Sequence, residues 1–288
     1  MSGVGAGGDA VGGVQIHRSS PGPGRRWDLL SLQQRERASA GDPVVVLPLA
    51  ATEQHGPHLP LSTDVDIGEG ILGRALHALD PGDPAYRLPM RSVGASLEHE
   101  EWPGTLSRSA HELEEEVVAV GRDLVAQGVR RLLLFNSHGG NKAVLDTAAL
   151  RLRVDHRMLV VKANYFRFPR PEGLDLPEEE WIHGLHGGAV ETAMMLYLHP
   201  DRVRVAEIRP FHSLGEVLAR TLSFVAPEGI APFAWTARDL NPAGVTGDAS
   251  RATAEMGRAL VHHYARILAA ILEDTSRFPL DALADRDL

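Results

Sequence analysis

The chain has 288 residues and a formal net charge of -9, with hydrophobic and charged fractions of 43% and 23%. This composition is that of a folded globular protein, and the negative charge argues against nucleic acid and anionic membranes as partners. The chain contains no cysteine, which excludes disulfides, thiolate nucleophiles and cysteine-based zinc sites. Any metal must therefore be held by nitrogen and oxygen ligands, and fourteen histidines can supply the nitrogen.

The first 24 residues are rich in glycine and lack both the cationic and the apolar segments of a secretory signal. Their composition predicts a flexible extension over residues 1–24, because they offer too little apolar surface to offset the entropy of ordering. The remainder, residues 25–288, contains no internal repeat and is predicted to form a single domain. Its apolar runs are much shorter than the roughly 18 residues that a membrane-spanning helix needs, so we expect a cytoplasmic protein without a membrane partner.

Strand-like and helix-like patterns alternate along this domain. In chain order they predict a strand at 44–50, a helix at 64–79, a strand at 87–93, a helix at 109–127, a strand at 130–136, a helix at 142–155, a strand at 158–164, and helices at 189–198 and 250–272. Ser109, three residues before Glu112, is typical of a capping box, and Gly128 ends that helix. Because neighbouring parallel strands need crossovers of helical length, the alternation predicts an α/β fold with a mainly parallel sheet covered on both faces.

The segment ATEQHGPHLPLSTD, residues 51–64, follows the first predicted strand directly. In open α/β sheets, functional side chains gather on the loops beyond the carboxyl ends of the strands. The segment carries three ligand-type side chains, Glu53, His55 and Asp64. Pro57 and Pro60 stiffen the loop, so these side chains can be held pointing toward one place, as a metal requires.

Two further loops present side chains of the same kind. His138 lies in NSHGGN at the end of the third predicted strand, and HGLHGGAVET places His183 and His186 before a turn and Glu191 at the start of a helix. Carboxylates and imidazoles without sulfur suit Zn²⁺, Mn²⁺ or Fe²⁺. One carboxylate that bridges two ions is a usual way to build a dinuclear hydrolytic site.

Each loop also has a structural interpretation without chemistry. A His-Gly-Gly sequence often marks only a tight turn, Glu191 could be a solvated helix residue, and the charged run at 98–101 would ordinarily be a solvated loop. The protein could then be a non-catalytic member of its fold that keeps one metal for stability. Convergence favours the metal site, because the structural interpretation must hold independently for all three loops.

Five segments of the chain together resemble the creatininase (creatinine amidohydrolase) family. In order they are LPLAATEQHGPHLPLSTD, VGASLEHEEWPGTLS, NSHGGN, HGLHGGAVETAMML and NPAGVTGDAS, and the match runs from about residue 43 to 270. The resemblance implies a three-layer α/β/α fold around a parallel sheet and a dinuclear metal centre. It also implies hydrolysis of a non-peptide or small amide C–N bond, and frequently a homohexamer.

The resemblance also implies roles for individual residues. Glu53 and His138 would bind one divalent ion and His55 the other, Asp64 would bridge both, and Glu191 would lie at the centre as a further ligand or close neighbour. The two ions would be Zn, Mn or Fe. His58 and Gln54, in the same segment, have no ligand role in the family pattern.

His186 would be the acid and base that carries a proton, with Glu191 beside it. The loop from Ser96 to Thr105 is expected to cover the site. The residues expected to shape the substrate pocket are His99, Trp102, Gly139, Gly140 and His183.

Gly140 departs from the pattern of the enzymes that open creatinine, which have a glutamate two residues after the histidine that matches His138. The HGGN form resembles other branches, among them formamide deformylases and the peptidase that trims the mycofactocin precursor. The expected function is therefore a metal-dependent amidohydrolase that acts on a small cyclic amide, ureide or formamide. The alternatives are a metallopeptidase that trims a short peptide, a mononuclear site, and a non-catalytic member.

Overall fold

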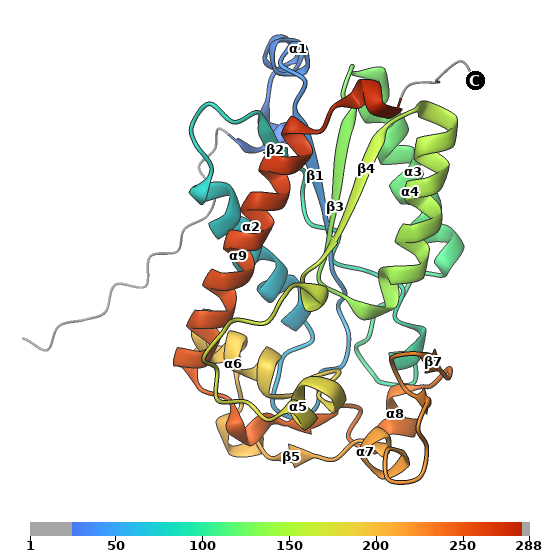
Figure 1. Cartoon of the computed structure of the whole chain (residues 1–288), viewed down its shortest axis with the longest axis vertical. Helices are drawn as coiled ribbons and strands as arrows, with labels where there is room; N and C mark the ends of the chain where they lie inside the picture. Colours follow the sequence, from blue (N-terminus) through green and yellow to red (C-terminus); the bar gives the residue numbers. More distant parts are fainter. Residues whose placement is uncertain (1–24, 284–288) are drawn as a thin grey trace, which may run out of the picture.

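Four parallel strands form the central sheet, in the order β2-β1-β3-β4. They are β1 (Val44–Leu49), β2 (Ala85–Arg87), β3 (Arg131–Asn136) and β4 (Leu159–Asn164). The structure is a computed structural model that describes residues 25–283 (Figure 1), so the predicted extension of residues 1–24 lies outside the described residues. β1 and β3 are buried along their whole length, which explains their continuous apolar sequences.

Helices cover both faces of this sheet (Figure 1). On one face lie α2 (Thr63–Ala78), α6 (Ala189–Leu198) and α9 (Ala254–Arg277), and on the other lie α3 (Ala110–Ala126) and α4 (Lys142–His156). Successive side chains of a strand point to opposite faces, so Val44 and Val46 pack under the first group while Val45 and Leu47 pack under the second. The predicted three-layer α/β/α fold with a mainly parallel sheet is confirmed.

The later part of the chain adds short elements at the carboxyl ends of the strands (Figure 1). They are α5 (Glu178–His183), β5 (Pro210–Phe211), α7 (Leu214–Leu218), β6 (Val225–Ala226), β7 (Ala231–Pro232), α8 (Ala237–Leu240) and β8 (Gly247–Asp248). β5 pairs with β8, and β6 pairs with β7. At the opposite end of the sheet, α1 (Leu32–Ala40) precedes β1. No helix within residues 25–283 is long and apolar enough to cross a membrane.

Seven of the nine predicted elements have ends within one residue of their expected positions. The helix predicted at 250–272 is α9, which begins four residues and ends five residues later than expected. The capping box of α3 is confirmed, because Ser109 and Glu112 bond to each other's backbone N–H groups. The predicted strand at 87–93 is wrong in its extent, since β2 ends at Arg87. The chain continues beside β1, with Leu88 N donating to Val46 O, but Pro89 has no N–H and interrupts the ladder.

α6 and α9 approach each other closely at one glycine. A Cβ atom on Gly257 of α9 would lie 1.8 Å from the carbonyl oxygen of Ala193 in α6. No side chain fits into this distance, so only glycine allows the two helix backbones to meet here. Because Glu191 lies in the first turn of α6, this contact also fixes the position of one predicted site residue.

Candidate metal centre

The loop after β1 and the first turn of α2 bring together three buried side chains. Glu53 donates its backbone N–H to Leu61 O at 3.0 Å, which folds the loop back on itself. Glu53, His55 and Asp64 are 1%, 0% and 2% exposed. Asp64 lies in the first turn of α2, where the helix dipole stabilises a carboxylate.

Asp64 lies between two imidazole rings. Its Oδ1 is 3.2 Å from His55 Nε2, and its Oδ2 is 3.1 Å from His138 Nδ1. The same His138 Nδ1 is 3.2 Å from Glu53 Oε1. The structure therefore brings together four predicted ligands from two loops, with one oxygen of Asp64 facing each histidine.

Backbone carbonyl groups fix the orientation of both rings. His55 Nδ1 is 3.1 Å from Glu53 O, and His138 Nε2 is 3.0 Å from Ala95 O. When these nitrogens donate their hydrogens to the carbonyl groups, the other nitrogen of each ring faces the carboxylates, where it can bind a metal that displaces its proton. This arrangement is the one that metal-binding histidines usually have.

Glu191 and His186 lie at the side of His55. Glu191 Oε2 accepts a hydrogen bond from Gly187 N at 2.6 Å and is 3.9 Å from His55 Nε2. His186 stacks on His55 with 4.0 Å between ring centroids. The segment before β8 supports this turn, since Thr246 N donates to His186 O at 2.8 Å.

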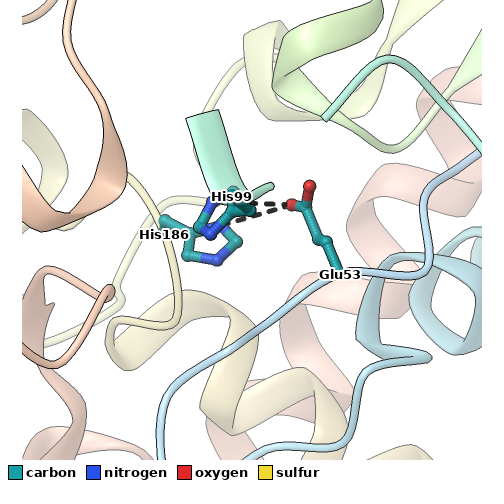
Figure 2. A group of neighbouring side chains, drawn as sticks. All are labelled: Glu53, His99 and His186. Atoms are coloured by element: carbon teal, nitrogen blue, oxygen red, sulfur yellow. Dashed lines mark ion pairs between the residues drawn. The ribbon is translucent and has the colours of Figure 1, made fainter. Parts of the chain in front are cut away.

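Figure 2 shows how Glu53 faces two further rings. Glu53 Oε1 is 3.7 Å from His186 Nδ1 and 3.9 Å from His99 Nε2. His99 ends a short 3-10 helix, Leu97–His99, in the loop between β2 and α3, and its ring stacks on His186 with centroids 4.3 Å apart. The Glu53 carboxylate thus connects three loops that are distant in the sequence.

The buried charges shift one another's pKa values. Burial acts to raise the pKa of Glu53, but His138 and the other imidazoles outweigh it and hold that pKa well below its usual range. Burial acts to lower the pKa of His55, but Asp64, Glu191 and Glu53 outweigh it and raise the pKa to about 9. The pKa of His138 is also raised, because the effect of Glu53 and Asp64 exceeds that of burial. Protons on the imidazoles therefore balance the carboxylates, and a bound cation would replace those protons.

The donor set fits a metal ion. Within residues 25–283, Glu53 Oε2, His55 Nε2 and Asp64 Oδ2 are buried and make no hydrogen bond of good geometry, although the last two lie near an ionic partner. Such atoms are costly to bury unless another group satisfies them. Their nitrogen and oxygen donors suit Zn²⁺, Mn²⁺ or Fe²⁺. Four overlapping groups of side chains place one ligand atom each within 4.8 Å of one another: Glu53, His55 and Asp64; Glu53, Glu98 and His138; His55, His186 and Glu191; and Glu53, His99 and His186.

A cavity of about 900 Å³ opens onto this cluster, and Glu53, Asp64, His138, His186 and Glu191 form part of its lining. Its lining includes aromatic side chains from segments far apart in the chain, among them Phe166, Trp181, Phe233 and Trp235. The cavity therefore joins the ligand cluster to a surface that suits an apolar part of a substrate.

Three predicted pocket residues, His99, Gly139 and Gly140, line this cavity, but two others do not. Trp102 lies under Arg238, with 4.6 Å between the guanidinium carbon and the ring centroid. His183 ends α5 and lies against Gly215 of α7. Trp102 and His183 are absent from the lining of this cavity, and their expected role in a substrate pocket stays a prediction.

The sequence reasoning missed Asn141, which is fully buried beside the cluster. Its Oδ1 accepts a hydrogen bond from Ala95 N at 3.0 Å, and its Nδ2 donates to Asn136 Oδ1 at 3.0 Å. Asn141 therefore ties the loop that orients His138 to the end of β3. The sequence feature that could have pointed to Asn141 is its place as the last residue of NSHGGN.

Glu98 differs from the expectation of a solvated charged loop. It lines the cavity, and its Oε1 is 3.8 Å from His138 Nε2. Glu100 and Glu101, in the same run, are exposed as expected. His58 is buried and binds Gly187 O and Thr192 Oγ1 at 3.1 and 2.9 Å, so it positions the turn beside His186.

Known proteins are similar to this chain over most of its length. The Creatininase family model, described as creatinine amidohydrolase, matches residues 28–272. The mycofactocin precursor peptide peptidase of Mycobacterium tuberculosis (strain CDC 1551 / Oshkosh) is 34% identical over 241 residues, which cover 82% of this chain and 84% of the relative. The creatinine amidohydrolase of Pseudomonas putida is 32% identical over 184 residues, which cover 58% of this chain and 68% of the relative. A solved structure described as "Creatininase Mn" is 26% identical with a TM-score of 0.69, covering 88% of this chain and 99% of that one. The chain therefore belongs to the creatininase family.

Proposed function

We propose that this chain hydrolyses a carbon-nitrogen amide bond with the help of two divalent metal ions, Zn, Mn or Fe. The observation that carries the proposal is the position of Asp64, whose two carboxylate oxygens each face a different buried histidine at 3.1–3.2 Å. A carboxylate placed in this way is suited to bridging two ions. The names of the relatives, one a peptidase and one an amidohydrolase, support amide hydrolysis as the reaction.

The ligands divide into two groups around Asp64. Glu53 and His138 would hold one ion together with Asp64 Oδ2, and His55 would hold the other together with Asp64 Oδ1. Glu191, 3.9 Å from His55 Nε2, would complete the second group, which makes a mononuclear site the weaker alternative despite Gly140. When bound, such ions acidify water and polarise an amide carbonyl group.

His186 is proposed to move the proton between water and the leaving nitrogen. Its Nε2–H donates to Gln54 O at 2.8 Å, so Nδ1 faces the carboxylates and the cavity. Burial lowers the pKa of His186 and the neighbouring His55 lowers it further, so the ring is neutral near neutral pH. A neutral Nδ1 can accept a proton from the attacking water and then donate it to the departing nitrogen.

The sequence favours a small cyclic amide, ureide or formamide as substrate, with a short peptide as the alternative. A cavity of about 900 Å³ is at the upper end of the usual size for ligand sites, and a molecule as small as creatinine would fill little of it. The aromatic walls and the relative named as a peptide peptidase support the peptide alternative. Both classes therefore belong in the first activity screen.

The test is a hydrolysis screen coupled to metal analysis. The purified chain is analysed for bound metal, treated with a chelator, and assayed before and after Zn²⁺ or Mn²⁺ is returned. The panel contains lactams, ureides, formamides and short peptides with apolar residues. We expect about two ions per chain and activity that is lost on chelation and restored by the metal. Activity that survives complete metal removal would rule out the proposal.

The homohexamer that the resemblance implies and the cytoplasmic location expected from the sequence both stay predictions. Light scattering measures the first, with an expected mass of six times the 31.2 kDa chain. Nucleic acid is not an expected partner, because the net charge is -9.

A further inference from the structure

Glu98 is the one carboxylate of its charged run that turns inward. Its side chain is 19% exposed, whereas that of Glu101 is 44% exposed and pairs with Arg238 at 3.0 Å. Within residues 25–283, no lysine or arginine forms an ion pair with Glu98. Its one ionic contact is His138 Nε2 at 3.8 Å, and that nitrogen already faces the carbonyl oxygen of Ala95. A cationic partner would stabilise a largely enclosed carboxylate in this position.

The space that Glu98 occupies exists because residue 140 is glycine. A Cβ atom on Gly140 would lie 2.2 Å from Ala95 O, 2.6 Å from His138 Nε2 and 2.7 Å from Glu98 Oε1. A glutamate at position 140 therefore cannot be accommodated with this arrangement of the loop. The loop that carries Glu98 fills the place that such a side chain would need.

The two proposed ion positions are unequal unless Glu98 takes part. Within residues 25–283, the His55 side has Asp64, Glu191 and the ring of His186 within reach, whereas Glu53 and Asp64 are the carboxylates that contact His138 Nδ1 directly. Glu98, Glu53 and His138 each place one ligand atom within 4.8 Å of one another. Ligand atoms that share one Zn²⁺ ion, with bonds of ~2.1 Å, lie at most ~4.2 Å apart. The Glu98 carboxylate lies on the Nε2 side of His138 and would turn toward the ion on the Nδ1 side to meet this limit.

On the basis of the proposed dinuclear function, we propose that Glu98 is a ligand of the ion held by Glu53 and His138. It brings a carboxylate from the loop between β2 and α3 to the place where Gly140 offers no side chain. Its negative charge also matters, because Glu53, Asp64 and Glu191 together leave two divalent ions with one excess positive charge. A fourth carboxylate makes the protein-metal centre neutral before water or substrate binds.

The experiment measures metal binding by Glu98→Gln, which keeps the shape of the side chain and removes its charge. Metal-free protein is titrated with Mn²⁺, and bound ions are counted by electron paramagnetic resonance. Glu100→Gln is the matched control, because Glu100 is exposed and two residues away. We expect the wild type and Glu100→Gln to bind two ions alike, and Glu98→Gln to bind one of the two at least about tenfold more weakly. If Glu98→Gln does not fold, Glu98→Asp, which keeps the charge but shortens the reach, is expected to weaken the same ion.

Unchanged affinity for both ions in the Glu98 variants would overturn the proposal, even if hydrolysis fell, because Glu98 would then act on the substrate. A wild type that binds no Mn²⁺ or Zn²⁺ would instead overturn the proposed function and this inference with it. A wild type that binds one ion, which Glu98→Gln weakens, would support Glu98 as a ligand and contradict only the second ion. The titration therefore distinguishes a failure of Glu98 as a ligand from a failure of the proposed metal-dependent function.

Discussion

At the scale of single residues, the histidines near the cluster have different surroundings and different expected tasks. His55 and His138 turn one nitrogen to a backbone carbonyl group and the other to carboxylates. His186 is held in the same way by Gln54 O, but its free nitrogen is farther from the nearest carboxylate oxygen, at 3.7 Å. This difference in reach separates the proposed ligands from the proposed proton carrier.

Replacing His186 by alanine should therefore reduce catalysis without removing metal. We expect kcat to fall by about 10²–10⁴, the usual contribution of a general acid or base, while the metal content stays that of the wild type. His183→Ala is the matched control, because His183 lies three residues away and outside the cavity. Loss of an ion from His186→Ala would show that His186 is a ligand rather than a proton carrier.

Metal affinity should rise with pH. In the metal-free protein the pKa of His55 is raised to about 9 and that of His138 is raised as well, so near neutral pH both rings carry protons that a metal must displace. Affinity should increase from neutral pH until about pH 9 and then level off as His55 loses its proton. Calorimetric titrations in buffers of different ionisation enthalpy measure the protons released. Affinity that is constant between these pH values would contradict the arrangement.

The ligand residues could be predicted from the sequence because they stand in short segments next to predicted strand ends. The orientation of Glu98 could not, because four charged residues in a row give no local pattern that separates inward from outward positions. The orientation of Glu98 depends on a single 3-10 turn, Leu97–His99, which directs His99 and Glu98 inward. The same limit explains Trp102, whose size suggests a pocket wall although Arg238 covers it.

At the scale of elements, the strands were predictable where burial is complete and less so at the edge. β1 and β3 lie in the interior of the sheet, so burial on both faces requires apolar residues throughout. β2 is an edge strand of three residues, and its end depends on the missing N–H of Pro89 rather than on hydrophobic pattern.

The two glycines of NSHGGN, in the 3-10 turn Gly139–Asn141, should respond very differently to alanine. A Cβ at Gly139 meets nothing within 4 Å, whereas a Cβ at Gly140 would lie 2.2 Å from Ala95 O. We expect Gly140→Ala to displace the loop that orients His138, lower metal affinity by about tenfold or more, and lower the melting temperature. Gly139→Ala should bind metal as the wild type does. Equal behaviour of the two variants in metal titration and thermal unfolding would contradict the close approach at Gly140.

At the scale of the whole molecule, the cluster joins segments from both halves of the chain. Ions bound there should stabilise the folded state, because the unfolded chain cannot bring these side chains together. At a free ion concentration 100 times Kd the gain is about 2.7 kcal/mol, which corresponds to roughly 5–10 °C in Tm for a chain of this size. Calorimetric scans with and without Zn²⁺ measure this shift. Asp64→Asn, which loses the proposed bridge, should show little of it.

The contact between Gly257 and the carbonyl of Ala193 has a consequence for engineering the substrate range of this fold. Glu191 and Ala193 belong to the same helix, so a bulkier residue at 257 would force α6 and α9 apart and displace Glu191 from the cavity, although residue 257 does not line it. Phe233 and Trp235, by contrast, lie on a wall that carries none of the proposed ligands. A library that varies the aromatic wall and keeps position 257 fixed would separate changes in substrate preference from loss of the metal centre.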